Sequence, residues 1–366
     1  MKYVLCGGGT SGHVMPAIAI ADALKKYDEN AEILFVGRRG GKENRSFLKS
    51  GHTFTPIEVY PLSISLSKEN FKRLIKNLKS FKSADEILEN FRPDAVIGTG
   101  GYVCFPVIKS ASKRKIPCFM HESNSIAGKS AKYTSKYCRC VFTGYRDCIG
   151  FPKKANLKYT GTPVRNQFKD ISKTASRREL GVKEGEFFIF SFGGSGGARK
   201  LNEVMLDVIR NYSSVTKGVR HIHVCGEKYY QEIDEKLKQF TLPFTDDIHT
   251  YISASDLVIS RSGALTIAEL AHLKKASILI PSPNVTANHQ YKNAKAISDA
   301  GGAVLIEEKE LNTEKLIKII SSLREDLSRR IRLSRCISRF SNPQAENEIS
   351  EIVIKSLKSA LPRNKY

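Results

Sequence analysis

The sequence predicts an α/β protein with two doubly wound parallel sheets. Apolar runs of strand length alternate with helical patterns along almost the whole chain, which is typical of βαβ units. Each half opens with a strand that runs into a glycine cluster, as in folds that bind a ligand at the carboxyl ends of their strands. The length of 366 residues suffices for about two domains. We therefore expect two Rossmann-like domains.

The expected strands are the buried apolar runs Tyr3–Cys6, Ile33–Val36, Ala95–Ile97, Cys118–Met120, Phe188–Phe192, His221–Cys225, Leu257–Ile259 and Ser277–Ile280. The clearest helical patterns between them cover Ala17–Lys26, Ser83–Phe91, Leu201–Arg210 and Ala264–Leu273. Proline and glycine at Tyr159–Val164 and at Ser341–Pro343 indicate two joints. The expected domains are therefore residues 1–163 and 164–341, followed by a final helix within 342–366.

The charge balance is strongly basic. Fifty-nine Lys and Arg residues against 37 Asp and Glu leave a net charge of +22 and a pI of about 9.6. Such a surplus implies an anionic partner, which is a nucleic acid, a phosphorylated ligand or an acidic lipid surface. The composition alone does not choose among them, although 41% hydrophobic residues exclude a disordered chain.

The cysteines and the N-terminus indicate a cytoplasmic protein. The eight cysteines include no Cys-x2-Cys pair, so neither a zinc site nor a disulfide framework is expected. The apolar run before Gly7 is too short for a signal peptide, and no stretch approaches the ~18 apolar residues of a spanning helix. Any membrane contact is therefore expected to be peripheral.

Three glycine-rich loops follow expected strands, at Gly7–His13, Gly98–Tyr102 and Gly193–Ala198. Glycine lets a backbone approach a ligand closely, and the following helix offers unpaired N–H groups to a diphosphate. None of the loops is a P-loop or fits a dinucleotide fingerprint. The alternative is that these glycines only turn the chain.

Pro16 is expected to be the first residue of a helix, which leaves His13 in the loop before it. A histidine at that point can act as a general base near neutral pH. The alternative is a loop histidine that hydrogen-bonds the backbone.

An ordered set of motifs carries a resemblance: Gly8–Pro16, Gly100–Tyr102, His121–Gly128, Gly161–Arg165, Gly193–Ala198, Arg261–Thr266 with Glu269, and Asn288–Gln290. Over residues 1–305 this set resembles the MurG family of bacterial N-acetylglucosamine (GlcNAc) transferases. The resemblance implies the GT-B fold, in which two Rossmann-like domains face a cleft and a C-terminal helix crosses back to the first domain. It implies inverting transfer of GlcNAc from UDP-GlcNAc to the 4-hydroxyl of the N-acetylmuramoyl (MurNAc) unit of lipid I. The product is lipid II of peptidoglycan synthesis.

The resemblance also assigns residues. The first domain would bind lipid I through Gly100, Gly101, Tyr102 and His121. The donor-binding residues would be Thr10, Ser11, Gly12, Asn124, Arg165, Ser195, Ile252, Ala264, Leu265, Thr266, Glu269 and Gln290, most of them in the second domain. Within this set, Ser195 would donate to phosphate, the backbone around Ile252 would pair with uracil, and Glu269 would accept the ribose hydroxyls. The choice of base rests on position instead: His13 is preferred because its loop should face the acceptor, and Glu122 is its competitor.

No metal or cofactor is expected, because the chain contains no Asp-x-Asp and the Gly193–Ala198 loop can supply positive potential for the leaving diphosphate. His221 and His223 share one strand face without an evident third ligand, so we interpret them as structural. The expected partners are UDP-GlcNAc, lipid I and anionic inner-leaflet lipids at the cytoplasmic face of the membrane; no nucleic acid is expected.

The segment Lys68–Lys82 combines an apolar arc with lysine and arginine on one flank. The arc contains Phe71, Leu74, Ile75, Leu78 and Phe81. A basic amphipathic helix suits the headgroup region of an anionic membrane. The alternative is a surface helix that buries its apolar face in the first domain.

Two other functions remain open at this point. One is a different GT-B enzyme, such as a glycolipid glycosyltransferase or a UDP-GlcNAc epimerase, and an epimerase would not need the acceptor motifs. The other is a binder of nucleic acid or another polyanion, which the charge favours but no known module signature supports.

Overall fold

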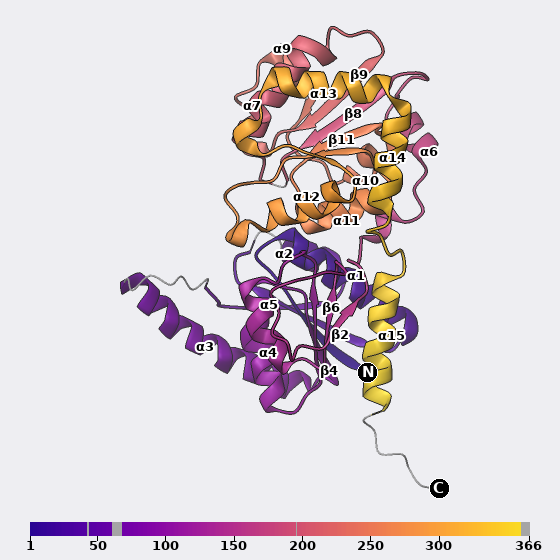
Figure 1. The fold of residues 1–366 in the computed structure, drawn as a ribbon. Helices are drawn as coiled ribbons and strands as arrows, with labels where there is room; N and C mark the ends of the chain where they lie inside the picture. The colour runs from indigo at the N-terminus through magenta and orange to yellow at the C-terminus, as the bar shows by residue number, and fades with distance from the viewer. Residues whose placement is uncertain (42–43, 61–67, 195, 360–366) are drawn as a thin grey trace. The chain divides into compact units, whose positions relative to one another are not determined.

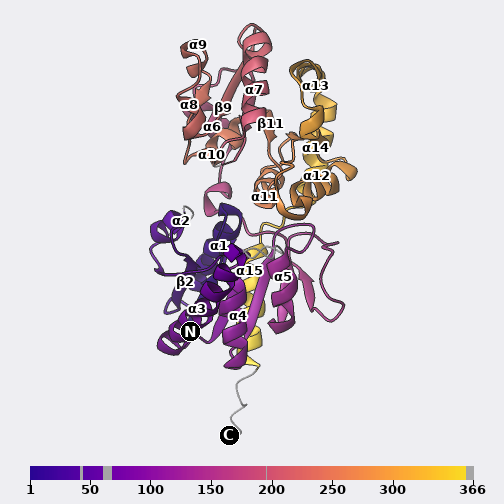
Figure 2. The same cartoon turned by 90° about the vertical axis from the view of Figure 1, so that its left-hand side faces the viewer.

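The computed structural model describes residues 1–41, 44–60, 68–194 and 196–359. The chain forms two compact units. Unit 1 contains Met1–Arg165 and the C-terminal segment from Asn342, and unit 2 contains Asn166–Ser341. Both units consist of a parallel sheet with helices on both faces, which confirms the predicted fold class (Figures 1 and 2).

Unit 1 has a seven-stranded sheet in the order β3-β2-β1-β4-β5-β6-β7. The strands are β1 (Lys2–Cys6), β2 (Glu32–Arg38), β3 (Thr53–Ile57), β4 (Ala95–Gly98), β5 (Cys118–Glu122), β6 (Cys140–Thr143) and β7 (Leu157–Tyr159). The helices are α1 (Ser11–Tyr27), α2 (Asn44–Lys49), α3 (Lys68–Phe91), α4 (Cys104–Lys113), α5 (Lys129–Thr134) and α15 (Ala345–Lys358). The first strand lies in the middle of the sheet, where the strand order reverses.

Two apolar layers hold unit 1 together. On one face of the sheet α1 packs with α15, whose Ile349, Val353 and Leu357 are buried in one apolar cluster with residues of α1 and of the sheet. On the other face Ala84 and Leu88 of α3 pack with α4 and α5. The last helix of the chain is therefore part of the core of the first unit, as Figure 1 shows in yellow.

Unit 2 has a six-stranded sheet in the order β10-β9-β8-β11-β12-β13. The strands are β8 (Phe187–Phe192), β9 (Val219–Val224), β10 (Thr241–Leu242), β11 (Leu257–Ser260), β12 (Ser277–Leu279) and β13 (Val304–Leu305). The α-helices are α6 (Lys173–Glu179), α7 (Arg199–Val208), α8 (Glu227–Tyr230), α9 (Glu235–Lys238), α10 (Ile248–Ala254), α11 (Ala264–His272), α12 (His289–Asp299), α13 (Thr313–Glu325) and α14 (Leu327–Ser338). A π-helix over Ile209–Ser213 continues α7.

The start of α1 corrects one prediction. The helix begins at Ser11, and Pro16 lies inside it rather than at its first position. Proline lacks an N–H, so α1 loses only the bond from residue 16 to the carbonyl of Gly12. His13 consequently lies in the first turn of α1, not in the loop before it.

Within the described residues, no helix combines the length and apolar character needed to span a bilayer.

Candidate functional site

Two glycine-rich loops of unit 1 that contain candidate site residues meet where the strand order of its sheet reverses. The loop after β1 leads into α1, and the loop after β4 leads into α4, so both loops lie at the carboxyl edge of adjacent strands. The N–H of Gly8 donates to the carbonyl of Gly100 at 3.3 Å, which joins the two loops. Ligands of open α/β sheets bind at this point of the fold.

The hydrogen bonds of His13 determine which ring nitrogen carries the proton. Nδ1 lies 2.9 Å from the carbonyl oxygen of Gly8. A carbonyl only accepts, so Nδ1 must donate, and the neutral ring then has its lone pair on Nε2. His13 is partly exposed, and the hydroxyl of Thr99 donates to its backbone carbonyl at 2.7 Å. The imidazole therefore presents a fixed proton acceptor at Nε2.

Two glycines make room for this ring and for its loop. A methyl group on Gly100 would lie 2.4 Å from Cδ2 and 2.8 Å from Nε2 of His13. A methyl group on Gly101, whose φ is +85°, would lie 2.1 Å from the carbonyl oxygen of Gly8. Only glycine fits at either position. The Gly100–Tyr102 loop thus passes directly against His13, as the shared carboxyl edge predicts.

His121 is fully buried at the end of β5. Its Nε2 donates to the carbonyl of Gly161 at 3.0 Å, and the hydroxyl of Ser123 lies 3.3 Å from Nδ1. Burial and, to a smaller extent, the nearby His13 lower the pKa of His121 to about 4, although the hydrogen bond to Gly161 opposes this. The ring is therefore neutral near pH 7, with both nitrogens used inside the protein.

Both carboxylate oxygens of Glu122 accept hydrogen bonds from the loop that follows. Oε1 accepts from the backbone N–H of Asn124 at 3.0 Å and from its side-chain amide at 2.8 Å. Oε2 accepts from the N–H of Gly128 at 2.9 Å. Glu122 is only 6% exposed. These contacts fix the loop 123–128.

The loops of unit 2 meet in the same topological place. The loop Gly193–Ala198 follows β8, the segment Arg261–Gly263 follows β11, and these strands are neighbours where the order reverses. A methyl group on Gly197, whose φ is +70°, would lie 2.1 Å from the carbonyl oxygen of Cys225. A cavity of about 470 Å³ opens beside this loop. Its lining includes Gly193, Gly197 and Ala198.

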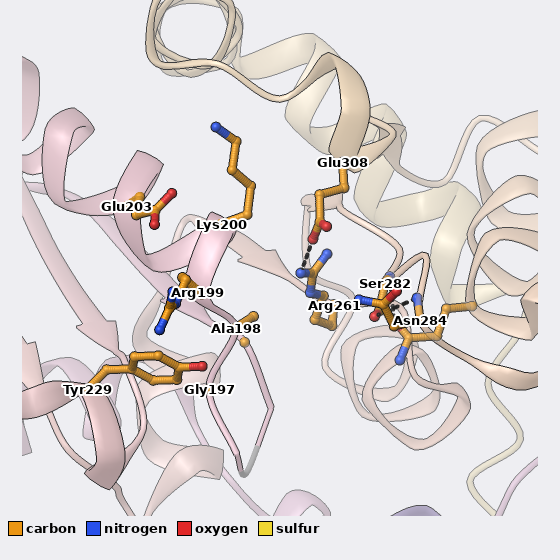
Figure 3. A pocket seen from close by; sticks show the side chains of 12 residues that line it. Gly197, Ala198, Arg199, Lys200, Glu203, Tyr229, Arg261, Ser282, Asn284 and Glu308 are labelled. Atoms are coloured by element: carbon orange, nitrogen blue, oxygen red, sulfur yellow. Dashed lines mark hydrogen bonds and ion pairs between the residues drawn. The ribbon is translucent and has the colours of Figure 1, made fainter.

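Charged side chains from three elements line this cavity (Figure 3). Arg261 extends from the end of β11 and donates to the carbonyls of Ile280 and Pro281 at 3.2 and 3.1 Å. Its other terminal nitrogen pairs with Glu308. Arg199, Lys200 and Glu203 come from α7, the helix that follows the glycine loop.

Arg199, Lys200 and Arg261 line the cavity but are not among the site residues expected from the sequence. A signal was present for the first two, because they are the first two residues of a helix with no acidic residue in its first turn. Cations are unfavourable at the positive end of a helix unless an anion lies nearby. Two of them directly after a glycine loop therefore indicate a site for a negatively charged ligand.

The first turn of α11 supplies further unpaired amides. Its N-cap is Gly263, which has no side chain to cap the helix, and the first intrahelical bond runs from Ile267 to Gly263. The N–H groups of Ala264, Leu265 and Thr266 therefore lack helical acceptors. Glu269 follows on the same helix and is only 3% exposed. It is not among the residues that line the cavity.

Gln290 and Ile252 lie in different surroundings. Gln290 lines the cavity, and its side-chain oxygen accepts from the N–H of Ser282 at 2.9 Å. Ile252 is fully buried in α10, and its carbonyl accepts from the hydroxyl of Ser255 at 2.8 Å. The uracil contacts predicted for this region would therefore need other backbone groups of the helix end.

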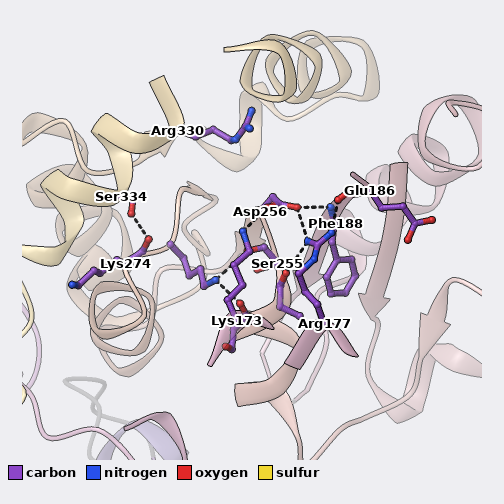
Figure 4. A network of polar contacts seen from close by, with 12 residues as sticks. Lys173, Arg177, Glu186, Phe188, Ser255, Asp256, Lys274, Arg330 and Ser334 are labelled. Atoms are coloured by element: carbon purple, nitrogen blue, oxygen red, sulfur yellow. Dashed lines mark hydrogen bonds and ion pairs between the residues drawn. The ribbon is translucent and has the colours of Figure 1, made fainter. Parts of the chain in front are cut away.

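A buried lysine fixes that end of α10. Lys275 donates to the carbonyls of Ser253 and Ser255 at 2.6 and 3.1 Å. Burial, together with the charges of Lys173 and Arg177, lowers the pKa of Lys275 to about 7, although Asp256 opposes this. Asp256 in turn accepts from Lys173 at 2.6 Å and from Arg177 at 3.0 Å, as Figure 4 shows.

Comparison with known proteins identifies the family. Residues 3–143 match the glycosyltransferase family 28 N-terminal domain, and residues 188–349 match the family 28 C-terminal domain. A UDP-N-acetylglucosamine–N-acetylmuramyl-(pentapeptide) pyrophosphoryl-undecaprenol N-acetylglucosamine transferase of Desulforamulus reducens is 35% identical over 375 residues, covering 99% of this chain and 100% of its own. The protein of the same name from Thermoanaerobacter pseudethanolicus is 37% identical and covers 88% of this chain and 91% of its own. The chain belongs to the MurG family.

Solved structures agree with the fold of the MurG family. MurG of Acinetobacter baumannii superposes with a TM-score of 0.76 at 24% identity and covers 97% of this chain and 99% of its own. A UDP-GlcNAc 2-epimerase from Neisseria meningitidis bound to UDP-GlcNAc reaches 0.67 at 14% identity, with 97% and 100% coverage. At such identities the likeness concerns the fold alone.

The site residues predicted for a MurG family member lie in both units. Unit 1 contains the proposed catalytic and acceptor residues together with the donor residues Thr10, Ser11, Gly12, Asn124 and Arg165. Unit 2 contains Ile252, Ala264, Leu265, Thr266, Glu269 and Gln290. Ser195 lies outside the described residues. Their contacts with ligands stay predictions.

Proposed function

We propose that this chain transfers GlcNAc from UDP-GlcNAc to the 4-hydroxyl of the MurNAc unit of lipid I, with inversion, and so forms lipid II. The observation that carries this proposal is 35% identity over nearly the full length to relatives named for that transfer. The glycine loops and the imidazole of unit 1, and the charged cavity of unit 2, supply the chemistry that such a transfer needs.

His13 is the general base in this proposal. Its Nε2 takes the proton from the 4-hydroxyl while that oxygen attacks C1 of GlcNAc. The bond between C1 and the diphosphate oxygen breaks on the opposite face, and UDP leaves with the electron pair. The support is the bond from Nδ1 to Gly8, which keeps the Nε2 lone pair available.

Glu122, the competing base, has a different role in this proposal. Its carboxylate accepts three hydrogen bonds from Asn124 and Gly128, and moving it toward a sugar hydroxyl would leave those donors unpaired. We assign Glu122 to positioning the loop 123–128 beside the acceptor.

Unit 2 binds the donor and stabilises the departing UDP. The diphosphate would lie against the glycine loop 193–198, where helix N–H groups and the cations Arg199 and Lys200 favour negative charge. This arrangement supplies positive potential from the chain's own groups.

We further propose that the enzyme works at the cytoplasmic face of the membrane, where α3 contacts anionic lipids. Arg73 and Lys79 lie in this helix, and Leu78 is 63% exposed. Phe81, by contrast, packs edge-on against Phe105 of α4 at 5.9 Å. Phe71, Leu74 and Ile75 of the predicted apolar arc lie outside the described side chains. The support is thus an exposed leucine on a basic helix.

The activity is tested with labelled UDP-GlcNAc and a short-chain lipid I analogue. We expect a labelled disaccharide product that forms only when the acceptor is present. A parallel reaction without acceptor tests for epimerisation of UDP-GlcNAc. Conversion of the sugar nucleotide in that reaction, with no transfer in the first, would replace the proposal with an epimerase.

Membrane contact is tested by changing Lys72, Arg73, Lys76 and Lys79 together to glutamine. We expect this variant to lose binding to anionic vesicles, since each cation near such a surface contributes roughly 1 kcal/mol. Its activity on a water-soluble acceptor should persist. Vesicle binding equal to that of the unchanged protein would show that another surface makes the contact.

A further inference from the structure

A chain of hydrogen bonds runs through the interior of unit 2 and includes none of the residues to which the proposed function gives a chemical role. It links Ser213 of the π-helix, His221, Ser191, His223 and Asn202 of α7. Each of these residues is at most 4% exposed. The contacts in this order measure 3.0, 2.8, 2.8 and 3.1 Å. The pair of histidines singled out in the sequence is thus part of one polar network.

The direction of each bond follows from the Asn202 end. The side-chain amide nitrogen of Asn202 donates to the carbonyl of Cys225 at 2.8 Å, so its oxygen must accept from Nε2–H of His223. Nδ1 of His223 then accepts from the hydroxyl of Ser191, which in turn accepts from Nε2–H of His221. Burial lowers the pKa of both histidines, to about 3 for His221 and about 4 for His223, which keeps both rings neutral.

The network ends at the glycine loop. The carbonyl of Cys225, which Asn202 holds, is the atom that a methyl group on Gly197 would meet at 2.1 Å. A methyl group on Gly226 would lie 2.9 Å from the backbone nitrogen of Gly197. The turn at Cys225–Gly226 therefore lies directly against the loop, and Gly197 in turn lines the cavity.

We propose that His223 is a positioning residue for the diphosphate loop. Its Nε2–H orients the amide of Asn202, which holds the Cys225–Gly226 turn, and the turn sets the position of Gly197. His223 touches no substrate in this proposal. The ligand class, a nucleoside diphosphate, rests on the proposed function; the control of the loop's position does not.

His221 provides a matched control. It is as buried as His223, lies on the same strand and bonds to the same serine hydroxyl, but it does not contact Asn202. After a change at position 221 the hydroxyl of Ser191 still donates to His223. A network that serves stability alone would respond to both changes in the same way.

The experiment compares His223→Asn with His221→Asn in the full-length protein. The shorter amide at position 223 still reaches Ser191 but not Asn202. Both variants should lose thermal stability to a similar extent. Only His223→Asn should speed hydrogen–deuterium exchange of peptides covering residues 193–198 in the free protein. It should also weaken UDP binding, measured by calorimetry, by about 10-fold, the factor that one lost hydrogen bond represents.

His223→Gln should restore slow exchange and UDP affinity, because its longer amide can again donate to the oxygen of Asn202. Equal exchange at residues 193–198 in both asparagine variants, or no restoration by glutamine, would overturn the inference. If the unchanged protein does not bind UDP, the proposed function fails, and the exchange measurement still decides the role of His223.

Discussion

The two units have a glycine-rich loop at the same topological position, but the surroundings of the loop differ. Both place a glycine-rich loop where the strand order reverses, and both contain a glycine whose methyl group would lie 2.1 Å from a carbonyl oxygen, at Gly101 and Gly197. In unit 1 the loops close around the imidazole of His13. In unit 2, a methyl group on Gly194 or Gly196 would have no atom of the described residues within 4 Å, and a cavity of about 470 Å³ lies beside the loop.

This difference separates two catalytic tasks. Acid–base chemistry needs one side chain in a fixed tautomer and orientation, and close packing against Gly100 provides this. Binding a diphosphate needs space, amide donors and cations, which the loop of unit 2 offers together with Arg199 and Lys200. The same strand–loop–helix unit can serve either purpose, according to what packs against its glycines.

The largest effect should come from the imidazole of unit 1. His13→Ala should lower kcat by about 10²- to 10⁴-fold, the usual contribution of a general base, while the donor KM changes little. Steady-state kinetics with both substrates varied would measure this. Turnover near that of the unchanged protein would move the role of base to Glu122 or another group.

Alanine substitution of the two crowded glycines, Gly101 and Gly197, should change the KM of different substrates. Gly101→Ala should raise the acceptor KM, and Gly197→Ala the donor KM, each by about 10- to 100-fold, since both force backbone atoms apart at a positive φ. Gly196→Ala is the matched control and should stay within about twofold, because its methyl group meets no atom. If Gly101→Ala and Gly197→Ala each raised the KM of both substrates, the two loops would not act separately.

A smaller effect is expected from Glu269. Loss of its carboxylate should cost about 1–3 kcal/mol of donor binding, because two ribose hydroxyls would lose their acceptor. Glu269→Ala should therefore raise the donor KM and leave the acceptor KM unchanged. Glu269→Gln, which keeps an acceptor oxygen, should be affected less. An unchanged donor KM would show that this buried carboxylate serves only the packing of α11.

The smallest effect is a pH dependence confined to unit 2. Lys275 titrates at about 7 in the fold instead of 10.5, so between these values the unfolded chain binds more protons than the folded one. Stability should therefore rise with pH above 7, by at most about 1.4 kcal/mol per pH unit from this group. Urea denaturation at pH 7 to 9 should show this slope in the unchanged protein but not in Lys275→Met. Parallel curves for both would contradict the burial of a titrating lysine.

The sequence predicted the long, apolar elements well and the marginal ones poorly. The buried strands around Val4, Val96 and Phe190 follow directly from hydrophobic runs. The edge strand β7 was missed because two of its three residues are exposed, so it has no apolar pattern. Pro16 is expected at a helix start because proline favours that position. In the structure α1 begins earlier, at Ser11, and the packing of Val14 and Ala17 stabilises its first turns.

The sequence can indicate a candidate residue when its side-chain type is chemically reactive. It cannot indicate the protonation or hydrogen bonding of that residue when these depend on contacts in the fold. His13 next to a glycine loop could be found from the sequence, but its tautomer depends on the Gly8 carbonyl, which only the fold places there. The sequence offers Glu122 as the competitor of His13 for the role of base, but it gives no sign of the three loop donors that hold its carboxylate in the fold. Sequence spacing does not reveal that donors of the following loop will hydrogen-bond a carboxylate.

The position of α15 in the core of unit 1 has a consequence for how the protein is made. Ile349, Val353 and Leu357 reach that core only after all of residues 166–341 have been synthesised. At about 5–20 residues per second, the first 165 residues wait roughly 10 to 35 s on the ribosome before α15 can cover its part of the α1 side of their sheet. Unit 2 can fold during that interval, although it begins later in the sequence. The nascent chain therefore offers an apolar surface that a ribosome-bound chaperone can cover until translation ends.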